Sequence, residues 1–209
     1  MSHFRSAAGM LLAHATLVRG AAFLGSGLQP NGGDPVAIGG TLATKVVGNG
    51  LRELDRFLNL LVDEVAVLAA GDIIDTVAFA RRRNTAGKIA MIRRSMGLPH
   101  PDHERLRAMG RTRDCLFHCG GVVRRASYAG TRTMIAGWPP GTAAAKAPGL
   151  VLQLGDRLEV TPLDLARACQ FYHDIADTIV ADTKIFIGWI EFPASSGYIG
   201  NAIVACDGL

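Results

Sequence analysis

Residues 51–68 read LRELDRFLNLLVDEVAVL, and this stretch decides the fold. Its large aliphatic residues recur at alternating spacings of three and four positions: Leu51, Leu54, Leu58, Leu61, Val65 and Leu68. That spacing puts all of them on one side of an α-helix, where they form a stripe that packs against other helices. The sequence therefore predicts a core helix of a helical bundle.

Further helices are predicted on both sides of this stretch. An amphipathic N-terminal helix is indicated by apolar residues at helical spacing: Phe4, Ala8, Leu11, Leu12, Ala15, Val18 and Ala22. A short segment over residues 73–83 precedes a helix with one apolar face that ends at a Gly and a Pro: Ile89, Ile92, Met96, Gly97 and Pro99. Asp102 is the predicted N-cap of the next helix, which carries Leu106, Met109, Arg113, Leu116 and Gly120 on one stripe. We expect a mainly α, up-and-down bundle.

The last long helix has the clearest predicted start. Thr161 is followed by Pro162 and then by Asp164, a pattern that favours a capping box with Pro at the first helical position. An apolar stripe confirms the helical period: Leu165, Ala168, Tyr172, Ile175 and Ile179. Just before it, residues 150–154 and 157–160 predict a small β-hairpin around a Gly155-Asp156 turn.

The chain is predicted to form a single domain over residues 1–209. Residues 1–50 hold the N-terminal helix and a Gly-rich connector, residues 51–185 the helical core with the hairpin, and residues 186–209 a C-terminal extension with a short strand near Ile203. The N-terminal helix is expected to pack on the core, with a membrane-surface or targeting role as the alternative. Four cysteines without regular spacing predict reduced thiols and a cytoplasmic protein: Cys115, Cys119, Cys169 and Cys206.

Charge is unevenly distributed along the chain, although its formal net charge is only +4. Residues 81–132 contain thirteen Lys or Arg and three acidic residues, whereas the rest of the chain is net negative. A basic surface of this kind suits a polyanion such as RNA, and the candidate contacts are Arg107, Arg111, Arg124 and Arg125. The alternative is a set of solvated arginines on helix surfaces.

Residues 113–118 read Arg-Asp-Cys-Leu-Phe-His and carry most of the chemical information. Arg113 lies on the packing stripe of its helix, so its charge needs an internal acid, a solvent-open seam or a second subunit. Asp114 and His118 are four residues apart, which places them on one face where the carboxylate can orient the imidazole. Arg113 and His118 lie roughly 140° apart around an ideal helix. Gly120-Gly121 is expected to end the helix just after His118.

This segment, Arg113 to His118 with Gly120 following, resembles the R-[N/D/H]-x-x-x-H motif of the HEPN superfamily. The resemblance implies a helical bundle that forms a homodimer and cleaves RNA without a metal or other cofactor. It implies that His118 is the general acid/base for attack of a ribose 2′-hydroxyl on the adjacent phosphate, that Arg113 binds the phosphate, and that Asp114 orients one of them. It also implies a toxin–antitoxin or defence context, with an antitoxin or regulatory protein as a further partner. Asp, rather than the commoner Asn, occupies the second motif position.

Two other interpretations remain open. Two helices could present a zinc site built from Cys115, Cys119, Cys169 and His173, and the segment from His100 to His103 offers another pair of ligands. Alternatively, the chain is a non-catalytic helical module that dimerises and binds nucleic acid or protein. No Ser or Cys nucleophile motif is present.

Overall fold

The protein is mainly helical. The computed structural model describes residues 2–26, 38–69, 74–141 and 148–188, with side chains from residue 7 onward. Within these ranges it has six helices and one two-stranded antiparallel sheet. The predicted connector falls mostly in residues 27–37 and the predicted C-terminal extension mostly in residues 189–209, and both stretches lie outside the described residues.

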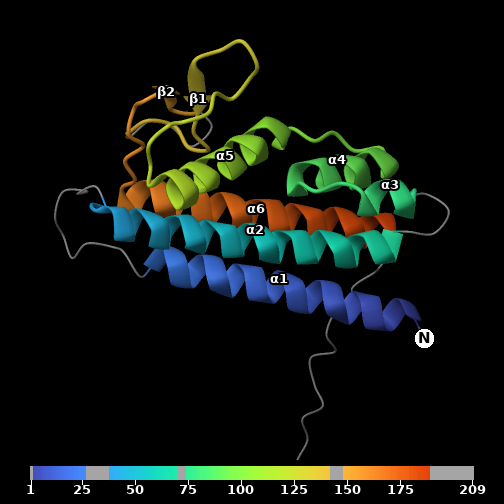
Figure 1. Cartoon of the computed structure of the whole chain (residues 1–209). Coiled ribbons are helices and arrows are strands. Elements are labelled where there is room, and N and C mark those ends of the chain that lie inside the picture. Colours follow the sequence, from blue (N-terminus) through green and yellow to red (C-terminus); the bar gives the residue numbers. More distant parts are fainter. Residues whose placement is uncertain (1, 27–37, 70–73, 142–147, 189–209) are drawn as a thin grey trace, which may run out of the picture.

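Three long helices form the centre of the molecule: α1 (Ser2–Ser26), α2 (Thr41–Ala69) and α6 (Pro162–Phe186). Each packs against the other two, and Figure 1 shows them side by side. The predicted stripe of α2 is confirmed, because every one of its six residues is at least 94% buried. The helix begins at Thr41, well before Leu51, since Thr44, Val47 and Gly48 continue the buried face towards the N-terminus.

The predicted stripe of α1 is wrong. Its buried residues are Met10, Leu17 and Ala21, on the side opposite to the exposed Leu11 and Leu12. Apolar residues surround most of this helix, so the periodicity alone did not select the packed face. Within the described residues, α1 is the one helix long and apolar enough to cross a membrane, but it packs on α2 and α6 here.

The shorter helices cover one side of this layer. These are α3 (Thr76–Ala80), α4 (Thr85–Ser95) and α5 (His103–Cys119). Asp75 and Asn84 cap α3 and α4 with their side chains, whereas Asp102 occupies the N-cap position of α5 without a capping hydrogen bond. Helix α5 touches α2 at Gly48, where an added Cβ would come within 2.7 Å of the backbone nitrogen of Phe117. This contact sets the position of the C-terminal end of α5.

The predicted hairpin is wrong in its pairing. Strand β2 (Val151–Gln153) pairs with β1 (Thr133–Ile135), with Met134 opposite Leu152. The chain does turn at Gly155, but Arg157 then bridges to Val122 instead of pairing back on β2. Backbone hydrogen bonds to Gly121 and Val123 take up the groups that the hairpin would have used.

The capping box of α6 is confirmed. The Thr161 hydroxyl accepts a hydrogen bond from the Asp164 backbone nitrogen at 3.1 Å, and the Asp164 carboxylate accepts one from the Thr161 backbone nitrogen at 3.0 Å. Pro162 is the first helical residue, as predicted. These contacts fix where α6 begins beside the sheet.

Candidate functional site

Helix α5 carries the residues that the sequence singles out. It ends as predicted at Gly120, which has a left-handed φ of 59°, and the Gly121 backbone nitrogen donates to the Cys115 carbonyl at 3.0 Å. His118 therefore lies in the last turn. The negative end of the helix dipole lies there.

Arg113 points from α5 towards α2 and is held by two carboxylates. Its Nη1 donates to Asp55 Oδ2 at 2.5 Å, and its Nε donates to Asp114 Oδ1 at 3.0 Å. The side chains of Arg113 and Asp55 are only 22% and 23% exposed. Asp55 is the internal acid that the position of Arg113 on the packing stripe requires.

Burial and nearby opposite charges both act on the pKa values of Asp55 and Arg113. Burial raises the pKa of Asp55 and outweighs the opposing effects of Arg113 and of a hydrogen bond from Thr85. Burial opposes the charge on Arg113 as well, but Asp55 and Asp114 together raise its pKa. The fully buried Tyr172 lies close enough for its own pKa to be raised, first by burial and then by Asp55. Arg113 is thus a permanent cation between α5 and α2, and its charge is compensated by the two carboxylates.

His118 lies on the solvent-exposed side of α5. Its ring packs edge-on against Phe117, with the ring centroids 4.9 Å apart, and Arg52 of α2 lies over the Phe117 ring at 5.2 Å. Among the described residues no hydrogen bond joins Asp114 to His118, because the Asp114 carboxylate accepts from Arg113. The imidazole is accessible to a ligand from solvent, and Arg113 reaches the surface on a different side of the helix.

The candidate RNA-binding arginines lie on α5 or soon after it. Arg107 and Arg111 precede His118 by eleven and seven residues and share its side of the helix. Arg107 pairs weakly with Glu104 at 3.5 Å, whereas Arg111 is half-buried over the Tyr128 ring at 5.7 Å. Arg124 and Arg125 are exposed in the segment after the helix. The four are therefore spread along one side of α5 and past its end.

The zinc interpretation finds no support in the described part of the chain, where no three His, Cys, Asp or Glu side chains gather as a metal site would require. Burial raises the pKa of Cys115 to about 11 and that of Cys169 to about 12, so both are thiols near neutral pH. His100 and His103 pack edge-on with ring centroids 5.3 Å apart. Cys206 lies outside the described residues.

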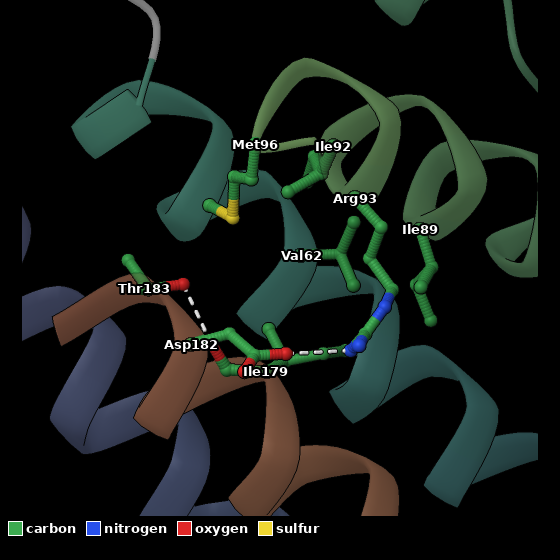
Figure 2. Close-up of a pocket in the computed structure, with 8 residues that line it drawn as sticks. All are labelled: Val62, Ile89, Ile92, Arg93, Met96, Ile179, Asp182 and Thr183. Carbon is green, nitrogen blue, oxygen red and sulfur yellow. Dashed lines mark hydrogen bonds and ion pairs between the residues drawn. The ribbon is translucent and has the colours of Figure 1, made fainter. Parts of the chain in front are cut away.

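Two cavities differ in size and character. Figure 2 shows the smaller one, between α4 and α6, where Arg93 pairs with Asp182 at 2.7 Å. Its volume of about 10 Å³ holds no more than a water molecule, so the ion pair is a brace between helices. The larger cavity, about 750 Å³, lies between α5, α6 and the chain that follows β1.

Several residues around these sites were not identified from the sequence. Asp55 lies outside the predicted apolar stripe of α2, and Trp138 lies outside every helix and strand predicted from the sequence. Their roles depend on contacts between residues far apart in the chain, such as the 58 residues that separate Asp55 from Arg113. No local pattern marks such contacts.

No family model, curated protein or solved structure matches this chain.

Proposed function

We propose that this protein is a metal-independent endoribonuclease of the HEPN type, active as a homodimer, with His118 as the general acid/base. The observation that carries the proposal is the exposed His118 at the negative end of α5, on the same helix side as Arg107 and Arg111. An accessible imidazole beside cationic side chains is the arrangement that phosphodiester cleavage by a 2′-hydroxyl needs.

The exposed side of α5 also suits a second copy of the same helix. Gly110 lies there, and an added Cβ at this position would meet nothing within 4 Å. A small residue at the surface of a helix lets another backbone approach closely. Two α5 helices related by a twofold axis would bring His118 of each copy towards the arginines of the other. Arg113 then holds the helix on α2 through Asp55 and presents its remaining surface to phosphate.

The test is RNA cleavage in the presence of EDTA. We expect the wild-type chain to cut a mixed RNA sample, and His118→Ala to abolish cutting while leaving the helical circular dichroism spectrum unchanged. His103→Ala removes an imidazole from the other end of α5 and is the matched control, with activity retained. Intact RNA with the wild-type protein, or equal cutting by His118→Ala, contradicts the ribonuclease proposal.

A second function is favoured by one observation. Two carboxylates already compensate Arg113, which suits a structural cation as well as a phosphate ligand. The alternative is therefore a non-catalytic dimeric module that binds RNA or a partner protein through the arginines of α5. A gel shift with RNA that stays intact, lost on Arg107→Gln with Arg111→Gln, supports the module. RNA that neither binds nor is cut leaves protein binding as the module's function.

A further inference from the structure

An arginine of α2 lies close to His118, which is on α5. The guanidinium carbon of Arg52 lies 5.2 Å from the centroid of the Phe117 ring. That ring packs edge-on against the imidazole of His118, with the two centroids 4.9 Å apart. The side chains of Arg52 and His118 are both exposed. An exposed cation of α2 and the exposed imidazole of α5 therefore contact one and the same phenyl ring.

The local sequence of α2 explains this arrangement. Gly48 and Arg52 are four residues apart and therefore share one side of the helix. A Cβ added at Gly48 would lie 2.7 Å from the backbone nitrogen of Phe117, so a glycine is needed where α5 comes closest to α2. This close approach places the Phe117 ring one turn further along α2, where the guanidinium of Arg52 lies over it.

The charge of Arg52 is not compensated by an acid. It lies within salt-bridge distance of no carboxylate in the described part of the chain, whereas two carboxylates hold Arg113. The adjacent Glu53 pairs with Arg56 instead, at 3.9 Å. A cation–π contact uses the flat face of a guanidinium and leaves the N–H groups at its edge able to donate to other acceptors. Arg52 can therefore bind an anion without giving up its contact with Phe117.

A second cation of α2 extends this positive surface. Lys45 precedes Arg52 by seven residues, which is about two helical turns, so both lie on one side of α2. Lys45 is exposed and makes no salt bridge among the described residues. Its neighbour Thr44 packs on Gly121, where an added Cβ would lie 3.4 Å from the Thr44 methyl carbon. The first turns of α2 thus border the end of α5 that carries His118.

The end of α5 does not attract a phosphate by itself. Its last carbonyl groups carry partial negative charge, which disfavours an anion. Asp114, one turn before His118, is 58% exposed and adds a negative charge, although Arg113 is bound to it. A phosphate that reaches His118 therefore needs cations from another element, and α2 supplies them.

We propose that Arg52 binds a phosphate of an RNA strand beside His118, with Lys45 as a second phosphate contact along the same strand. This inference rests on the proposed ribonuclease function, in which the phosphate on Arg52 is that of the bond to be cleaved. There the 2′-oxygen bonds to phosphorus while the bond to the 5′-oxygen breaks, a proton leaves the 2′-hydroxyl and a proton reaches the 5′-oxygen. Negative charge grows on the non-bridging oxygens, to which a guanidinium can donate two parallel hydrogen bonds.

An uncleavable strand tests the contact separately from catalysis. A short single-stranded oligonucleotide built of 2′-deoxyriboses lacks the attacking hydroxyl, and fluorescence anisotropy measures its affinity for the full chain at several salt concentrations. We expect Arg52→Gln to lower the affinity at least about ten-fold. It should also reduce the slope of log affinity against log salt concentration by about 0.7, the contribution of one phosphate of a single strand. Arg52→Lys keeps the charge and should keep the slope, whereas an arginine that only packs on Phe117 would leave the slope unchanged in both variants.

Arg56→Gln is the matched control. Arg56 lies one turn further along α2 and is 70% exposed, so this variant should leave both the affinity and the slope unchanged. The second measurement is cleavage of RNA in EDTA, where Arg52→Gln should be about 100-fold slower than the wild type, with an unchanged circular dichroism spectrum.

The outcomes separate the two proposals. Equal affinity and slope in Arg52→Gln and Arg56→Gln, or no binding of the oligonucleotide by the wild type, overturns the phosphate contact. Binding that depends on Arg52 but is accompanied by no cleavage of RNA overturns the ribonuclease proposal and leaves the contact standing. Cleavage that needs His118 but not Arg52 does the reverse.

Discussion

Arg113 and Arg111 are two residues apart on α5 and occupy opposite electrostatic environments. Arg113 faces α2, where Asp55 and Asp114 hold it at 2.5 and 3.0 Å. Arg111 faces the cavity, where it stacks on Tyr128 and its buried Nε has no acceptor among the described residues. The pKa of Arg113 is raised by its carboxylates, and that of Arg111 is lowered by burial.

This difference separates a cation held by two carboxylates from one that makes no salt bridge among the described residues. A buried charge with its partner in place helps to hold two elements together, and removing the partner lowers the free energy of unfolding. A buried charge without one is destabilising by itself. The two sides of α5 should therefore respond in opposite ways to mutation.

The largest expected effect is on the α2 side. Asp55→Ala leaves Arg113 partly buried with only the exposed Asp114 as partner, and we expect the free energy of unfolding to fall by about 3 kcal/mol. Urea unfolding followed by circular dichroism measures this change. Glu53→Ala removes a more exposed carboxylate from the same helix and should change stability by less than about 0.5 kcal/mol.

A double variant sharpens the interpretation of this loss. Asp55→Leu combined with Arg113→Leu removes both charges together and should recover most of the stability lost in Asp55→Ala. If Asp55→Ala is as stable as the wild type, the pair does not hold α5 on α2, and Arg113 is not the structural cation of the comparison.

Two helical glycines test how closely each side of α5 is covered. Gly48→Ala places a Cβ against the backbone of Phe117, so we expect a loss of about 2 kcal/mol from overpacking. Gly110→Ala adds a Cβ where nothing lies within 4 Å and should stabilise the helix by about 0.5–1 kcal/mol. Thermal unfolding of both variants measures the two changes. Changes of the same sign would show that α2 does not limit the approach of α5 at Gly48.

Features set by neighbouring residues were predictable from the sequence. The capping box at Thr161 and the left-handed Gly120 at the end of α5 depend on residues within one or two turns, and both were found where predicted. The stripe of α2 was equally clear, because polar residues on its other sides leave one choice of packed face. The need of Arg113 for a compensating group also followed from its position on a stripe.

Features set by distant residues were not predictable. Strand β2 pairs with β1 across the fifteen residues that separate the two strands, and a sequence pattern cannot weigh that pairing against a local hairpin. The packed face of α1 was assigned to the wrong side because apolar residues occur nearly all round that helix. Asp55 and Trp138 acquire their contacts only when α2, α5 and the segment after β1 pack together. The sequence therefore predicted the motif from Arg113 to His118, but not the residues that surround it.

The smallest expected change in stability is on the cavity side. Arg111→Leu removes a half-buried cation that lacks a carboxylate partner within the described residues, so we expect the free energy of unfolding to stay unchanged or to rise by up to about 1 kcal/mol. Urea unfolding measures this change, and Asp55→Ala is the comparison. A loss above about 2 kcal/mol would mean that Arg111 holds the fold much as Arg113 does, and the two sides of α5 would no longer differ in kind.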